Sequence, residues 1–159
     1  MNSHIPADPV LHLVLVRPLI PPNTGTIARL CAATGCRLHL VGPLGFSLED
    51  RYLRRAGLDY WEHVRCQVWP DWNSLARHCP GGRFLFFSAR VFRPYTEAVF
   101  QTGDFLVFGN EEEGLPDALL LENSGQSFTI PMWGPVRSLN LSTSVGIVAY
   151  EALRQVKGF

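Results

Sequence analysis

The sequence predicts a single-domain α/β protein with a parallel six-stranded sheet and helices on both of its faces. Six short apolar runs of strand length alternate with helical patterns, and this alternation is typical of parallel βαβ units. The 159 residues, 47% of them hydrophobic, are enough for one substantial core and too few for a second domain. We expect residues 1–9 to be a flexible lead and residues 10–159 to form the domain.

Three strands are expected in the first half of the chain. Residues 11–16 form a continuous apolar run, and Asn23 or Thr24 is a suitable N-cap for a helix that Gly35 ends near Thr34. A strand is expected at 37–41, followed by a polar helix with three arginines that stops near residue 57. A third strand is expected at 64–68 and a short helix at 71–79.

The second half holds three further strands, expected at 84–88, 105–108 and 128–132, and a short helix at 117–122. After residue 132, the run Trp133-Gly-Pro cannot continue a strand or a helix. A terminal helix follows, because Ser138, Asn140 and Ser142 are good N-cap types and apolar residues then recur at helical spacing up to Val156.

Charge and cysteine content limit the possible functions. Fourteen basic residues balance 14 acidic ones, so contact with a polyanion has to come from local clusters. The four cysteines lack the spacing of a metal site, and we predict no bound metal. Without a signal peptide or an apolar run of membrane-spanning length, we expect a cytoplasmic protein with reduced thiols. No GxGxxG follows the first strand, which argues against a nicotinamide enzyme.

Three junctions after predicted strands carry polar or glycine-rich residues, at 21–29, 109–116 and 128–142. Ligands bind at the carboxyl ends of strands in open α/β sheets. In the third junction, Ile130, Met132 and Leu139 could line an apolar slot for a nucleoside, with Ser138 or Asn140 as hydrogen-bonding groups. Taken singly, each junction is also compatible with an ordinary helix cap or surface turn.

Together the junctions resemble the three motifs of the SPOUT RNA 2′-O-methyltransferases. The matching residues are Asn-Thr-Gly-x-x-x-Arg at 23–29, Gly-x-Glu-x-x-Gly-Leu-Pro at 109–116, and Ile-Pro-Met with Ser-Leu-Asn-Leu-Ser up to residue 142. Leu-Arg-Arg-Ala-Gly-Leu-Asp-Tyr at 53–60 is similar to the branch that methylates the wobble ribose of tRNA.

The resemblance implies a C-terminal trefoil knot, S-adenosylmethionine (SAM) as cofactor, and a homodimer in which Arg29 of one subunit approaches the cofactor of the other. The implied substrate is the wobble nucleotide 34, a cytidine or modified uridine, in the anticodon stem-loop of leucine tRNAs. The implied catalytic residues are Arg29, Asn23, Glu111, Ser138 and Asn140, and the implied cofactor contacts are Phe87, Gly109, Ile130, Met132, Ser138 and Leu139. The candidates for RNA binding are Arg51, Arg54, Arg55, Arg90 and Arg93.

Two positions depart from the family pattern. Asn110 stands where proline is common, which predicts a less rigid loop, and Trp133 to Val136 differ from the wobble branch close to the expected substrate entrance. Trp133 could stack on a base or cover the knot. The alternatives are the same chemistry on ribosomal RNA or another tRNA position, and a non-catalytic RNA-binding protein.

Overall fold

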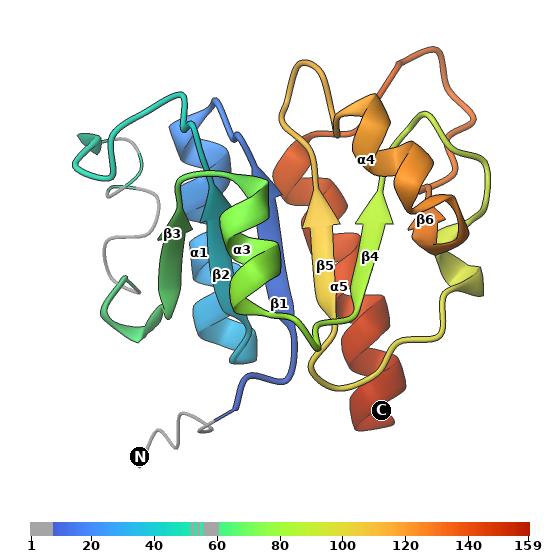
Figure 1. The fold of residues 1–159 in the computed structure, drawn as a ribbon, viewed down its shortest axis with the longest axis horizontal. Helices are drawn as coiled ribbons and strands as arrows, with labels where there is room; N and C mark the ends of the chain where they lie inside the picture. The colour runs from blue at the N-terminus through green and yellow to red at the C-terminus, as the bar shows by residue number, and fades with distance from the viewer. Residues whose placement is uncertain (1–7, 52, 54, 56–60) are drawn as a thin grey trace.

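The computed structural model describes residues 8–51, 53, 55 and 61–159, and in them six strands form one sheet (Figure 1). The strand order is β3-β2-β1-β5-β4-β6, and every pairing is parallel. The strands are β1 (His12–Val16), β2 (Arg37–Val41), β3 (Cys66–Trp69), β4 (Phe84–Phe87), β5 (Phe105–Phe108) and β6 (Ser127–Phe128). The predicted parallel six-stranded α/β sheet is therefore confirmed. The expected lead at residues 1–9 lies almost wholly outside the described residues.

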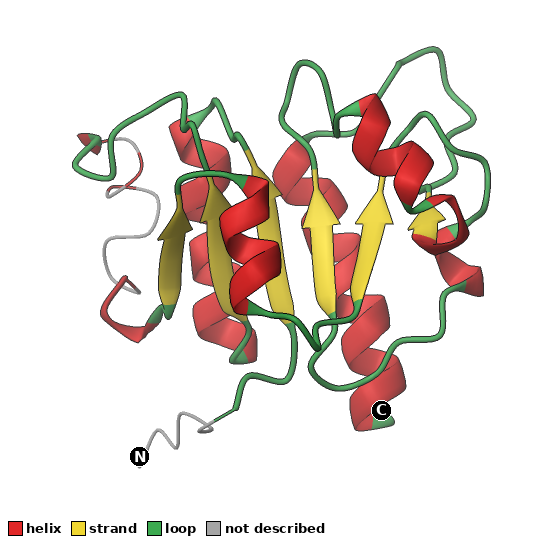
Figure 2. Ribbon diagram, viewed as in Figure 1, coloured by secondary structure: helices red, strands yellow, loops and turns green. Residues whose placement is uncertain are grey.

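Helices cover both faces of the sheet (Figure 2). Helices α1 (Pro21–Thr34) and α5 (Leu141–Lys157) pack on one face, and α3 (Trp72–His78) and α4 (Asp117–Glu122) lie on the other. Each face has its own cluster of buried apolar side chains, as expected for strands buried on both sides. Three 3₁₀ turns, η1 (Trp61–His63), η2 (Tyr95–Glu97) and η3 (Ser124–Gln126), complete the described elements.

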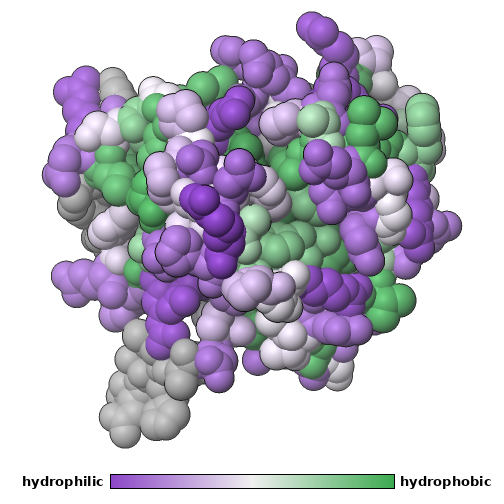
Figure 3. Space-filling view, in the orientation of Figure 1, coloured by the Kyte–Doolittle hydropathy of each residue, from purple (hydrophilic) through white to green (hydrophobic). Residues whose placement is uncertain are grey.

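The surface over α3 and α4 is mainly hydrophilic, and its hydrophobic side chains lie in separate patches (Figure 3). No helix within the described part of the chain is long and apolar enough to cross a membrane.

The predicted N-cap of α1 is wrong. The helix begins at Pro21 rather than at Asn23 or Thr24, and its N-cap residue Ile20 makes no side-chain capping bond. Two prolines in the first turn have no amide hydrogen to satisfy, so a local cap is unnecessary there. The C-terminal cap at Gly35 is confirmed, with a left-handed φ of 77°.

The sixth strand is shorter than predicted, because only Ser127 and Phe128 pair with β4. Beyond them Thr129 bonds to another segment: its amide donates to the Arg93 carbonyl at 2.7 Å, and its carbonyl accepts from the Tyr95 amide at 2.8 Å. Pro131 then lacks the amide that a ladder needs. The third strand begins at Cys66 instead of residue 64, where Val64 closes the η1 turn. Most of the polar helix expected up to residue 57 falls outside the described residues.

Two histidines and a tryptophan form a hydrogen-bonded chain on the face covered by α3. The Trp69 indole Nε1 donates to Nδ1 of His39 at 3.0 Å, and His39 Nε2 lies 2.8 Å from Nδ1 of His12. An indole nitrogen can only donate, so His39 carries its hydrogen on Nε2 and donates it to His12. The pKa of His12 falls from 6.5 to about 4, mainly because the ring is buried and also because of the charge of Arg37. The pKa of His39 falls to about 3, mainly through burial and also through the charges of His12 and Arg37.

We predict that acidification destabilises the fold through this pair. The unfolded chain takes up these protons near pH 6.5, whereas the folded chain resists them until about pH 4, so stability falls as the pH drops between these values. The expected loss at pH 5 is about 2 kcal/mol from the buried His39 and a smaller amount from His12, whose partial exposure to solvent screens its charge. Urea unfolding at pH 7.5 and 5 measures it. His39→Leu should flatten the pH dependence, while replacement of the exposed His63 by Gln should leave it intact; an equally steep pH dependence in His39→Leu would contradict this assignment.

Candidate active site

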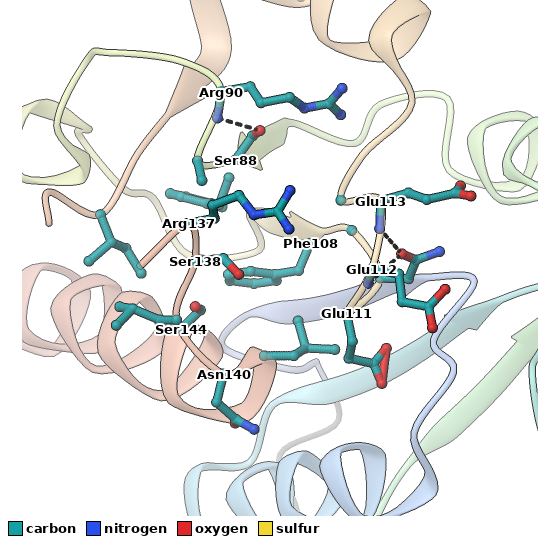
Figure 4. Close-up of a pocket in the computed structure, with 18 of the residues that line it drawn as sticks. Ser88, Arg90, Phe108, Glu111, Glu112, Glu113, Arg137, Ser138, Asn140 and Ser144 are labelled. Atoms are coloured by element: carbon teal, nitrogen blue, oxygen red, sulfur yellow. Dashed lines mark hydrogen bonds between the residues drawn. The ribbon is translucent and has the colours of Figure 1, made fainter. Parts of the chain in front are cut away.

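A cavity of about 780 Å³ opens at the carboxyl ends of β4, β5 and β6 (Figure 4). Three loops and the first turn of α5 surround it, and α1 contributes its first turn. Every predicted cofactor contact lines this cavity, as do four of the five predicted catalytic residues. The lining residues among these predictions are Asn23, Phe87, Gly109, Glu111, Ile130, Met132, Ser138, Leu139 and Asn140.

The cavity suits a nucleoside-bearing cation such as SAM. Its size lies within the usual range for small-molecule sites. Phe87, Phe108 and Ile130 give an apolar wall for a flat ring, while Glu112 and Glu113 offer negative charge on the opposite loop. A site with both features fits SAM, in which an adenosine is joined to a methionine part through a positively charged sulfur.

Gly109 lets two parts of the second loop touch. A Cβ atom built on Gly109 would lie 2.0 Å from the Gly114 carbonyl carbon and 2.1 Å from the Leu115 amide nitrogen. Both are backbone atoms, so no side chain at position 109 fits without moving the loop. Gly114 itself has a φ of +69°, which favours glycine.

Asn110 holds the same loop in a tight turn. Its side-chain Oδ1 accepts from the amides of Glu112 at 3.1 Å and Glu113 at 2.7 Å, and its backbone carbonyl accepts from the Gly114 amide at 3.2 Å. The asparagine side chain thus closes an Asx turn where the family commonly has proline, and the lower rigidity of this loop stays a prediction.

One hydrogen-bonded network joins all three motifs. Glu111 accepts from the amides of Leu19 and Ile20 at 2.9 and 2.6 Å, at the start of α1, and from Asn23 Nδ2 at 3.4 Å. Asn23 Oδ1 accepts from Asn140 Nδ2 at 3.1 Å, and Asn140 caps α5 by accepting from the Thr143 amide at 3.2 Å. Of the three cap candidates for α5, the structure selects Asn140. Glu111 thus ties the acidic loop to the two residues that precede α1.

We predict that Glu111→Ala lowers the free energy of unfolding by about 1–3 kcal/mol, because two amides next to α1 lose a charged acceptor. Urea denaturation measures the change. Glu112→Ala removes an exposed carboxylate from the same loop and is the matched control, expected within about 0.5 kcal/mol of wild type. Equal stability of the two variants would show that the Glu111 contacts are not stabilising.

The predicted arginines are spread over the molecule. Arg29 is exposed on α1 and is not part of the cavity wall of its own chain. Arg51 and Arg55 are exposed, and Arg54 lies outside the described residues. Arg90 lines the cavity but bonds to Asp117 and to the Leu115 carbonyl.

Arg93 is held by its own loop. It pairs with Glu97 at 3.2 Å, donates to the Gly125 carbonyl at 3.3 Å and lies over the Phe128 ring at 4.8 Å. These contacts of Arg90 and Arg93 position the loops beside the cavity.

Sequence reasoning missed several residues of the site. Arg137, Ser88 and Ser144 line the cavity, and the Arg137 side chain projects into it between the acidic loop and the loop after β4 (Figure 4). Arg137 lies directly before Ser138 in the third motif, and this adjacency was the available signal. Ser88 follows β4 immediately, so the carboxyl-end rule could have found it.

Among the described residues, no group of three or more histidine, cysteine, aspartate or glutamate side chains could hold a metal ion. The four cysteines are free, and burial raises the pKa of Cys66 to about 11, which keeps that thiol protonated.

Comparison with known proteins supports the same chemistry. The model of the SpoU rRNA Methylase family matches residues 10–150. A tRNA (cytidine(34)-2′-O)-methyltransferase from Burkholderia cenocepacia is 47% identical over 150 residues, covering 92% of this chain and 96% of the relative. The enzyme of the same name from Methylovorus glucosotrophus is 46% identical over 144 residues, covering 90% and 94%.

Solved structures agree in fold. A structure described as "Structural insights into the 2-OH methylation of C/U34 on tRNA" superposes with a TM-score of 0.90 at 49% identity, covering 94% of this chain and 97% of that one. An AdoMet-bound rRNA methyltransferase from Sinorhizobium meliloti has a TM-score of 0.83 at 25% identity, covering 94% and 57%. The resemblance read from the three motifs is confirmed by these matches.

Proposed function

The chain belongs to the SpoU rRNA Methylase family, and we propose that it uses SAM to methylate the ribose 2′-OH of nucleotide 34 in tRNA. One observation carries this function: a single cavity gathers all three motifs, and hydrogen bonds among Glu111, Asn23 and Asn140 join them. The sequence is also 47% identical to that of an enzyme named for this reaction.

Within this cavity the chain holds the reactants in line. When bound, SAM supplies a methyl group on a positively charged sulfur. Phe87, Ile130 and Leu139 line the cavity and would hold the adenosine portion by apolar contact. Ser138 lies on the cavity wall within the loop that leads to α5, where its hydroxyl faces the ligand space (Figure 4). Methyl transfer then requires the 2′-oxygen to approach opposite the sulfur, so positioning is the main contribution of the protein.

The proposed role of Arg29 is to orient the phosphate beside the reacting ribose and to stabilise the alkoxide that develops on its 2′-oxygen. A charged guanidinium has no lone pair to accept a proton, so a phosphate oxygen is the proton acceptor in this scheme. Because Arg29 lies outside the cavity of its own chain, a homodimer that brings it to the partner's cavity completes the site.

The finer assignments belong to the same proposal. The substrates are leucine tRNAs with cytidine or modified uridine at position 34, recognised through the anticodon stem-loop. Exposed arginines, including Arg51 and Arg55, contact its phosphates. The chain between β6 and α5 forms the trefoil knot of the family, and the enzyme works in the cytoplasm, where tRNA is its substrate.

The test is transfer of labelled methyl from SAM to tRNA from a strain that lacks this modification, followed by mapping of the labelled ribose. Label at nucleotide 34 of leucine tRNAs is the expected result. Label at another tRNA position or in ribosomal RNA would reassign the substrate, and SAM binding without transfer to any RNA would indicate a non-catalytic RNA-binding protein.

A further inference from the structure

Two aromatic side chains in the loops beside the cavity are almost fully exposed. The exposed fraction is 94% for Phe92 and 92% for Trp133, the highest among the large hydrophobic residues that the structure describes. An earlier alternative, that Trp133 covers the knot, does not fit a side chain this exposed. An aromatic ring left in water is typical of a binding surface rather than of a core.

Both rings belong to loops that build the cavity. Phe92 follows the lining residues Ser88 to Arg90 by two positions, and Trp133 directly follows the lining residue Met132. The two loops leave the carboxyl ends of the neighbouring strands β4 and β6 and are tied together through Thr129, which bonds to Arg93 and Tyr95. Figure 1 shows both loops at the same edge of the molecule. Both rings therefore belong to loops at the same edge of the molecule.

The loop after β4 is held by side-chain bonds, which keep Phe92 in place without burying it. Arg90 bonds to Asp117 and the Leu115 carbonyl, and Arg93 bonds to Glu97 and the Gly125 carbonyl. On the other loop Gly134 and Pro135 follow Trp133, and Arg137 turns back into the cavity. A rigid aromatic ring next to arginines is the usual composition of a surface that stacks unpaired bases.

We propose that Phe92 and Trp133 stack on the unpaired bases next to nucleotide 34 when its ribose enters the cavity. The inference rests on the proposed function and adds the residues that receive the flanking nucleotides. An anticodon loop offers unpaired bases on both sides of position 34, and a ribose held in the cavity places those bases at the rim. Stacking accepts any base, so these rings contribute affinity and positioning rather than sequence choice.

The experiment uses anticodon stem-loops with 2-aminopurine at position 33 or 35, titrated with the full-length protein. For Phe92→Ala and Trp133→Ala we expect about five- to hundredfold weaker binding and loss of the fluorescence quenching seen with wild type at one of the two positions. Trp133→Phe should restore most of the affinity. SAM affinity, oligomeric state and the salt dependence of RNA binding should not change, because no charge is removed. Leu121→Ala, exposed on α4 at 78%, is the matched control and should bind as wild type does.

Normal stem-loop affinity in both alanine variants, with wild type still methylating nucleotide 34, would overturn this inference and leave the proposed function standing. A changed oligomeric state in either variant would assign the rings to a contact between copies and also overturn it. Wild-type protein that fails to methylate nucleotide 34 would overturn the proposed function and, with it, the assignment to these neighbouring bases.

Discussion

A Gly109→Ala variant is expected to lose at least about a hundredfold in SAM affinity and to have almost no methyl transfer activity. The new Cβ would lie 2.0 Å from the Gly114 carbon, closer than any non-bonded contact allows, so the loop at 109–116 has to move. This loop carries one wall of the cavity, and displacements of about 1 Å at a reacting site cost on the order of a hundredfold. Calorimetric titration with SAM and the methyl transfer assay measure the two effects.

Gly134→Ala is the matched control. A Cβ on Gly134 meets no atom within 4 Å, and its φ is not in the left-handed region, so SAM affinity should stay at the wild-type value. Circular dichroism of both variants separates a local change in the loop from global unfolding. A folded Gly109→Ala protein with normal SAM affinity would show that the cofactor does not depend on this close backbone contact.

The second large effect is expected for Arg29→Ala, which should reduce methyl transfer by roughly 10²–10³-fold while SAM binding stays normal. Loss of one positively charged donor at developing negative charge has this magnitude. Arg29 is exposed on α1 and absent from the cavity wall of its own chain, so its removal should not disturb the cofactor site. Arg29→Lys distinguishes two roles: near-normal turnover would mean that charge suffices, and an inactive variant would mean that the planar guanidinium is needed.

Mixed dimers test whether Arg29 acts across subunits. Coexpression of Arg29→Ala with Gly109→Ala should restore about a quarter of wild-type activity, because half of the dimers are mixed and each has one intact site. Purification of the mixed dimer through two different tags makes the measurement direct. Activity no higher than the sum of the parents would place Arg29 in the site of its own chain or outside the chemistry.

Local patterns were sufficient to predict most of the fold. The buried runs at β1, β2, β4 and β5 are short and apolar, and the structure has each of them within a residue of the expected bounds. Gly35 ends α1 as predicted, and α3 begins within a residue of its expected start, where Asp71 caps it. Left-handed backbone and side-chain capping are properties of single residues, so local patterns can indicate them. The three motif loops were predicted for the same reason, since their glycines, prolines and amides interrupt regular structure.

Two features that local patterns did not predict involve partners far away in sequence. The Ile20 amide, directly before α1, donates to Glu111, 91 residues away, whereas a local cap at Asn23 or Thr24 was expected. Strand β6 ends after Phe128 because Thr129 bonds to the loop at 93–95, which no pattern around Thr129 indicates.

By itself the sequence determined the fold class, the three motifs and, through their resemblance to a known family, the chemistry. Only the tertiary structure decided that Asn23, Glu111 and Asn140 form one network, that Arg137 enters the cavity, that Arg29 stays outside it and that Phe92 and Trp133 remain exposed. The physical reason is that strand and helix formation depends on neighbouring residues, whereas a binding site depends on which loops the sheet order brings to the same edge.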